Sequence, residues 1–193
     1  MIEKILNYDT ELFLYLNNLG TTKYDKFWIL LSEIETNIVF YLLALGIFIF
    51  YSKTKLNSKL IFLLTFIIIL ILIADQSSNL FKDFFERLRP CYNESINSTV
   101  RLVKESCGGR FGFFSAHASN SFSLAIFFGF LLKKHSSMFM YISLVFASFI
   151  SYSRIYLGVH FPLDIIFGGI FGIINGFIIF KLYELFIKSF YKS

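Results

Sequence analysis

The sequence predicts an all-α protein, a polytopic bundle of about five to six transmembrane helices. Hydrophobic residues make up 56% of its 193 residues, and charged residues only 16%. Two apolar runs, at 38–51 and 60–74, are too long and too uniform for a soluble domain of this size, and only Thr65 interrupts the second. Because each crossing takes about 20 residues, we expect one integral membrane domain over residues 1–193, with no room for a separate soluble domain.

Residues 1–22 predict a helix that lies on the membrane surface. Ile5, Leu12 and Leu16 recur at helical spacing, while Lys4 takes the opposite, polar face. Such an amphipathic pattern is typical of an interfacial helix. If this segment crossed the bilayer instead, the number of spans would rise from about five to about six.

Five apolar segments further along the chain predict membrane-spanning helices. Pro90 is expected to end the second of them, because the residue before a proline, here Arg89, disfavours the helical conformation. The expected spans are residues 38–51, 59–88, 115–132, 137–156 and 162–186.

The distribution of basic residues indicates the orientation of these spans. The turn after the first span, the turn at Lys133 and Lys134, and the C-terminal tail together hold eight lysines, including Lys53, Lys55 and Lys192. With the cations near the polar loops set aside as functional, the positive-inside rule places these turns in the cytoplasm and the polar loops outside. The net charge of +5 falls in loops and helix ends, so we expect the lipid bilayer and lipid phosphates as partners, with no nucleic acid and no obligate protein partner.

The segment 153–164 carries the densest cluster of reactive residue types. Pro162 suits the first turn of a helix, so we expect His160 just before that helix and Asp164 within its first turn. There the carboxylate can fix the tautomer of one imidazole nitrogen and leave the other free to attack. Arg154 supplies a planar cation that suits phosphate oxygens. The alternative is a buried histidine that is only hydrogen-bonded at a helix start.

Polar residues at the end of the second span form a second cluster. Asp75, Lys82 and Arg89 are spaced by seven, so they share one face of a continuous helix, and Asn79 lies close to that face. An acidic group near hydrocarbon is costly, so we expect Asp75 to face the bundle interior. For Lys82 and Arg89 the alternative is a role as interfacial anchors.

A third cluster, Ser115 to His117, directly precedes an apolar span. Ser115 is expected to cap the helix, which puts Ala116 and His117 in the first turn, where backbone N–H groups have no helical partner. Such a helix start binds anions, and His117 can donate a proton to a leaving oxygen. The alternative is a capped helix with an incidental histidine. Because successive crossings alternate in direction, all three clusters fall on one face of the membrane.

Together the three clusters resemble the signature of the type 2 phosphatidic acid phosphatase superfamily, whose helical core is shared with vanadium haloperoxidases. The second motif departs from the family pattern, since Phe114 and Ala116 stand where proline and glycine are usual. Order and spacing otherwise fit over residues 82–164, as Lys82-x6-Arg89-Pro90, Ser115-Ala116-His117 and Ser153-Arg154-x5-His160-x3-Asp164.

The resemblance implies a haloperoxidase-like phosphatase core that needs no metal and no cofactor. His160 would attack phosphorus to give a phosphohistidine, with Asp164 orienting the imidazole. His117 would protonate the leaving group and then activate water. Asp75 and Asn79 are not part of the family signature, and their place on the same helix face makes them candidates for supporting the site. The phosphate oxygens would be held by Lys82, Arg89, Ser115, Ala116 and Arg154.

Cys91 and Cys107 bracket most of the outward loop between the first and second motifs. We expect a disulfide between them if this loop lies in an oxidising compartment, with two free thiols as the alternative. In the same loop Arg101, Lys104 and Arg110 could contact a second phosphate, or they could form a solvated face.

The leading functional hypothesis is hydrolysis of a lipid phosphate or diphosphate in a bacterial inner membrane, with the active site on the periplasmic face. Undecaprenyl diphosphate is the favoured substrate, and lipid A phosphate and phosphatidylglycerophosphate are close competitors. A phosphotransferase would carry the same motifs. A vanadate-dependent peroxidase is a less suitable function for a chain this hydrophobic. The remaining alternative is a membrane scaffold that catalyses no reaction.

Overall fold

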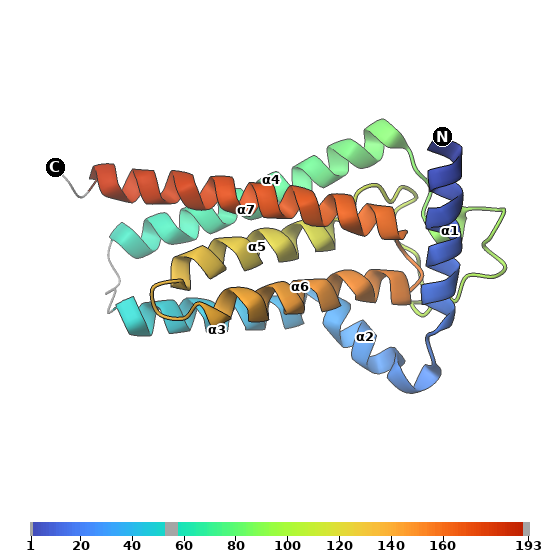
Figure 1. The fold of residues 1–193 in the computed structure, drawn as a ribbon, viewed down its shortest axis with the longest axis horizontal. Coiled ribbons are helices and arrows are strands. Elements are labelled where there is room, and N and C mark those ends of the chain that lie inside the picture. Colours follow the sequence, from blue (N-terminus) through green and yellow to red (C-terminus); the bar gives the residue numbers. More distant parts are fainter. Residues whose placement is uncertain (1, 53–57, 191–193) are drawn as a thin grey trace.

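The computed structural model describes residues 2–52 and 58–190 and shows an all-helical fold there (Figure 1). Lys53, Lys55 and Lys192, which the orientation argument uses, lie outside the described residues. Within those ranges there is no strand, and the α-helices are α1 Ile2–Asn18, α2 Asp25–Ser32, α3 Ile34–Ser52, α4 Ser58–Phe85, α5 Ala116–Leu132, α6 Met138–Tyr156 and α7 Pro162–Phe190.

Helices α3 to α7 run alongside one another as a bundle (Figure 1). By length and composition, three helical segments of the described chain can cross a membrane: Lys59–Phe85, Met138–Tyr156 and Pro162–Phe190. The other two helices of the bundle contain shorter apolar segments, Ile38–Phe50 and Ala116–Leu132. The expected membrane helix bundle is therefore confirmed, and its five helices correspond to the five expected spans.

Helix α1 lies across one end of the bundle, where α6 passes into α7 (Figure 1). Its buried face is formed by Asp9, Phe13 and Asn17, which are spaced by four. The ring of Phe13 packs edge-on against Phe161, with centroids 5.2 Å apart. The Asn17 amide donates to the carbonyl of Ile155 at 3.0 Å, so polar and apolar contacts both anchor α1. We keep the prediction that the exposed face of α1 lies on the membrane surface.

Helix α4 ends earlier than the sequence predicts, and this corrects the placement of Arg89. The helix stops at Phe85, and Glu86 adopts a left-handed conformation with φ of 46°, which a helix cannot accommodate. The chain then pairs with a later loop, because the N–H of Arg89 donates to the carbonyl of Arg110 at 3.1 Å. The expectation that Asp75, Lys82 and Arg89 share one continuous helix is thus wrong for Arg89.

The backbones of α5 and α7 approach each other unusually closely. Gly168, Gly172 and Gly176 follow one another at intervals of four on the face of α7 that meets α5. A Cβ atom at Gly172 would lie only 2.4 Å from the carbonyl oxygen of Ser119. At the end of this contact, the N–H of Ser115 donates to the carbonyl of Asp164 at 3.0 Å. Small residues allow this packing, and the sequence analysis does not single them out.

A buried amide links three helices in the middle of the bundle. The side chain of Asn175 on α7 donates to the carbonyl of Leu70 on α4 at 3.1 Å. It also donates to the hydroxyl of Ser123 on α5 at 3.0 Å. Interhelical hydrogen bonds of this kind help to hold helices together where lipid removes the hydrophobic driving force between them.

Replacing Gly172 with alanine should lower the free energy of unfolding by about 1 to 3 kcal/mol, because the new methyl group forces two backbones apart. Thermal unfolding in detergent measures this. The matched control is Gly46→Ala in α3, where an added Cβ has no heavy atom within 4 Å, and it should be neutral or stabilising. Equal stability of the two variants would contradict the close packing of α5 and α7.

Candidate active site

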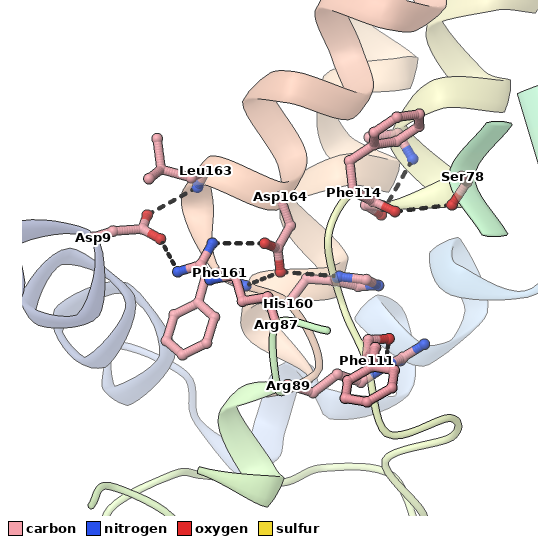
Figure 2. Close-up of polar contacts among 12 residues, drawn as sticks. Asp9, Ser78, Arg87, Arg89, Phe111, Phe114, His160, Phe161, Leu163 and Asp164 are labelled. Carbon is pink, nitrogen blue, oxygen red and sulfur yellow. Dashed lines mark hydrogen bonds and ion pairs between the residues drawn. The ribbon is translucent and has the colours of Figure 1, made fainter. Parts of the chain in front are cut away.

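Arg89, His160 and Asp164, from the first and last of the three motifs, lie near Asp9 of α1 (Figure 2). His160 lies in the turn between α6 and α7, and His117 in the first turn of α5. Arg154 lies in the last turn of α6, and Lys82 lies in the last turn of α4. The charges of Arg89, Arg154 and Lys82 all act on the imidazole of His160. The three motifs therefore form one cationic site around a histidine.

His160 and Asp164 form the buried centre of this site. Pro162 begins α7, so Asp164 falls in the first turn, one helical turn beyond His160. The Nδ1 of His160 lies 3.3 Å from Oδ2 of Asp164, and the same oxygen accepts the N–H of Phe161 at 3.0 Å. Because a carboxylate only accepts, Nδ1 is the donor and Nε2 keeps its lone pair. The imidazole is thus oriented with Nε2 as its nucleophilic atom.

The surroundings of His160 favour its neutral form. Its side chain is only 3% exposed. Burial, together with the positive charges of Arg89, Arg154 and Lys82, holds the pKa of His160 well below its ordinary value of 6.5. Neutral imidazole is the form that can act as a nucleophile, so the cations that suit an anion also keep His160 reactive.

Arg87 connects this centre to the N-terminal helix, a role that the sequence analysis misses. One nitrogen, Nη1, lies 2.7 Å from Oδ1 of Asp164, and the other, Nη2, lies 2.5 Å from Oδ2 of Asp9 (Figure 2). The guanidinium also stacks over the ring of Phe161 at 4.3 Å. Asp9 in turn accepts the N–H of Leu163 at 2.8 Å. A continuous chain of charges therefore runs from α1 to the imidazole.

Arg154 and Arg89, the two arginines expected to bind phosphate, each use part of the guanidinium group for hydrogen bonds within the protein. Arg154 donates through Nη1 to the hydroxyl of Ser32, and its buried Nε has no hydrogen-bond partner among the described residues. Arg89 donates through Nε to the carbonyl of Phe111 at 3.2 Å and through Nη1 to that of Cys107 at 2.9 Å. An anion would satisfy the orphaned donor of Arg154.

His117 is held by a residue that the sequence analysis does not single out. Its Nε2 lies 3.2 Å from the carbonyl oxygen of Ser32, at the end of α2. Since a carbonyl only accepts, Nε2 carries the proton there, and Nδ1 is left to exchange a proton with another group. Ser32 thus holds both His117 and Arg154, through its carbonyl and its hydroxyl.

The start of α5 has the expected cap. The hydroxyl of Ser115 accepts the N–H of Ala118 at 3.5 Å, so the predicted N-cap is confirmed. The carbonyl of the preceding Phe114 accepts the hydroxyl of Ser78 on α4 at 2.9 Å. The N–H of Ala116 therefore belongs to a helix start that α4 and α7 both hold in place, and such a start favours anions.

The loop between α4 and α5 contains a disulfide between Cys91 and Cys107, with Cα atoms 6.4 Å apart. Arg101 of this loop, for which the sequence left two roles open, forms an ion pair: its Nη2 lies 2.5 Å from Oδ1 of Asp25. Burial alone would raise the pKa of Asp25, but hydrogen bonds from Arg101 and Tyr156 outweigh burial and lower it. This ion pair fixes the loop to the start of α2.

The expected supporting residues Asp75 and Asn79 lie on α4 with separate partners. Asp75 accepts a hydrogen bond from the amide of Asn120 at 2.6 Å, and Asn79 lies 3.5 Å from the ammonium of Lys82, at the limit of a hydrogen bond.

Lys104 and Arg110 belong to the same outer loop as Arg101. Burial and the positive charge of Arg154 lower the pKa of Lys104. Its ammonium group is therefore close enough to Arg154 for the two charges to interact. In the part of the chain that the structure describes, no group of three or more metal-ligating side chains occurs.

Comparison with known proteins gives consistent results. A model of the PAP2 superfamily matches residues 58–188. A lipid A 4'-phosphatase of Porphyromonas gingivalis is 36% identical over 183 residues, which cover 94% of this chain and 75% of that protein. Another lipid A 4'-phosphatase, of Bacteroides thetaiotaomicron, is 34% identical over 184 residues. The aligned region covers 93% of this chain and 79% of that protein.

Two solved structures are similar along most of their length. Aquifex aeolicus LpxE aligns with a TM-score of 0.67 at 28% identity, over 89% of this chain and 93% of that one. A transmembrane PAP2 type phosphatidylglycerolphosphate phosphatase of Bacillus subtilis aligns with a TM-score of 0.70. The alignment covers 94% of this chain and 87% of that one. At 20% identity the second likeness is one of fold.

Replacing Arg87 with glutamine should lower the free energy of unfolding by about 3 kcal/mol, because two buried carboxylates lose their counter-charge. Arg87→Lys should recover part of this loss. Thermal unfolding in detergent measures both. Arg110→Gln, an exposed arginine of the same loop, is the matched control and should change stability little. An Arg87→Gln protein as stable as the control would show that the chain of charges contributes nothing.

Stability should also fall in acid because of His160. In the unfolded chain this histidine binds a proton near its ordinary pKa of 6.5, whereas the folded protein keeps it neutral to lower pH. Below that value the unfolded state binds more protons, so the free energy of unfolding falls by up to about 1.4 kcal/mol per pH unit. Denaturant unfolding from about pH 7.5 to about pH 5 should show a shallower dependence for His160→Gln. Identical slopes would contradict the lowered pKa.

Proposed function

The chain belongs to the PAP2 superfamily and is an integral membrane lipid phosphatase, and from this premise we propose that it removes a phosphate from lipid A. The observation that supports this substrate is the 36% and 34% identity to two lipid A 4'-phosphatases over more than nine-tenths of the chain. The superfamily suggested by the three motifs is confirmed. For the substrate, these relatives favour lipid A phosphate, an alternative in the sequence analysis, over undecaprenyl diphosphate.

In the proposed mechanism the first step forms a phosphohistidine. Nε2 of His160 attacks phosphorus, and the bond between phosphorus and the ester oxygen of the lipid breaks. His117, protonated at Nδ1, gives its proton to that oxygen, so the lipid leaves as a neutral alcohol. The carboxylate of Asp164 stabilises the positive charge that develops on the imidazole of His160.

The second step releases phosphate. His117, now neutral, takes a proton from a water molecule whose oxygen attacks phosphorus. The bond from phosphorus to Nε2 breaks, inorganic phosphate leaves and His160 returns to its neutral form. Each step passes through a transition state with charge on three equatorial oxygens. In the proposal, Arg154, Arg89, Lys82, Ser115 and the N–H of Ala116 stabilise that charge.

We also propose that the site faces the periplasm from a bacterial inner membrane. The site lies at the end of the bundle covered by α1, and the turn between α5 and α6 and the end of α7 lie at the opposite end (Figure 1). That opposite end carries Lys133, Lys134 and Lys188, as the positive-inside rule expects of a cytoplasmic surface. A lipid head group can reach the cations while its acyl chains stay in the bilayer.

Phosphate release in detergent with EDTA tests this function. The substrates are lipid A, undecaprenyl diphosphate and phosphatidylglycerophosphate. We expect release from lipid A to be fastest, to resist EDTA, and to fall at least about 1,000-fold in His160→Ala because the nucleophile is lost. His135→Ala is the matched control, since this third histidine lies in the turn after α5, at the far end of the bundle (Figure 1).

Three outcomes would contradict parts of the proposal. Full activity of His160→Ala would exclude the phosphohistidine. Faster release from undecaprenyl diphosphate than from lipid A would restore the isoprenoid as substrate. Transfer of phosphate to an added lipid or sugar alcohol in preference to water, seen by product analysis, would make the protein a phosphotransferase.

A further inference from the structure

A cavity of about 380 Å³ lies between α3, α4 and α5 and reaches the candidate active site. Most of its lining is aliphatic or aromatic, including Leu45, Ile67 and Phe128. His117 and Ala116, from the first turn of α5, also line it. A lipid whose phosphate sits among the cations of the site therefore has an apolar space beside the bond that His117 would protonate.

Two polar side chains break the apolar lining next to His117. Asp75 of α4 and Asn120 of α5 both line the cavity. The Nδ2 of Asn120 donates to Oδ1 of Asp75 at 2.6 Å, which uses one of its two N–H groups. The Oδ1 of Asn120 is buried and has no hydrogen-bond partner within the described ranges. The unmet hydrogen-bonding capacity of the pair therefore includes acceptor oxygens, of a carboxylate and of an amide.

A role in structure alone does not account for this arrangement. A hydrogen bond between α4 and α5 needs only one donor and one neutral acceptor, as Asn175 and Ser123 show deeper in the bundle. A carboxylate inside a membrane bundle is costly, and such groups usually serve function. The buried amide oxygen without a donor is a second cost, which a ligand with a donor would remove.

We infer that Asp75 and Asn120 form a subsite that accepts hydrogen bonds from the lipid part of the substrate. The ligand class is a lipid that carries hydroxyl or amide N–H groups close to its phosphate ester. An isoprenoid chain, which is hydrocarbon, offers no such donor and would leave the amide oxygen of Asn120 without a partner. This inference rests on the proposed lipid phosphatase function, and it adds the feature by which one lipid phosphate is preferred to another.

Two phosphate monoesters with two chains each make a matched pair of probes. Ceramide 1-phosphate has an amide N–H and a hydroxyl near its phosphate, whereas phosphatidic acid of equal chain length has only esters there. The measurement is kcat/KM for each lipid in mixed micelles. We expect the wild type to prefer ceramide 1-phosphate by about 10-fold, because a site built to hydrogen-bond a group rejects the analogue that lacks it.

Variants at residue 75 test whether the preference comes from this subsite. Asp75→Leu should bring the ratio of the two kcat/KM values close to one, through a loss confined to ceramide 1-phosphate. Asp75→Asn keeps the shape and one acceptor oxygen, so it should keep part of the preference. The control is Gln76→Leu, the next residue of α4, which is exposed and does not line the cavity, and it should keep the full ratio.

The outcomes separate the subsite from the function it rests on. Phosphate release without a preference in the wild type would overturn the subsite, and so would an equal loss on both lipids in Asp75→Leu, which indicates a structural role. A ratio unchanged in Asp75→Leu would overturn it as well. No release from either probe or from lipid A would overturn the proposed function itself, and the subsite with it.

Discussion

The close contact between the backbones of α5 and α7 is the constraint on which the site depends. Gly168, Gly172 and Gly176 have no side chain to hold the two backbones apart, so carbonyl oxygens of Ser115, Ser119 and Ser123 lie directly against α7 there. The bond from the Ser115 N–H to the Asp164 carbonyl then fixes the starts of both helices relative to each other. Since His117 and His160 belong to those two starts, helix packing in the membrane sets the distance between the two catalytic candidates.

Charge balance explains how the rest of the site is held. Asp164 is the buried carboxylate at its centre, and it accepts from Arg87, from His160 and from the N–H of Phe161. Three further cations, Arg89, Arg154 and Lys82, act on the same imidazole. A site with this cluster of positive charge, and an orphaned donor on Arg154, is complementary to an anion.

Sequence reasoning succeeds here where the determining pattern is local. Long apolar runs predict the spans, and a serine before an apolar run predicts the cap at Ser115. It fails where contacts join distant parts of the chain. Asp9 and Arg87 are 78 residues apart, and Ser32 and Arg154 are 122 apart, so no window of sequence contains either pair. The early end of α4 has the same origin, because pairing with the loop near Arg110 overrides the helical preference after Phe85.

The disulfide between Cys91 and Cys107 couples the loop between α4 and α5 to one cation of the site. The carbonyl of Cys107 holds Arg89, and the bridge ties that carbonyl to the turn that follows Arg89. A reduced chain would keep its membrane bundle, because the contact between α5 and α7 does not involve this loop, but it would hold Arg89 less firmly. Loss of the bridge would therefore act on the anion site and not on the bundle, so the oxidation state of this loop bears on phosphate binding rather than on insertion into the membrane.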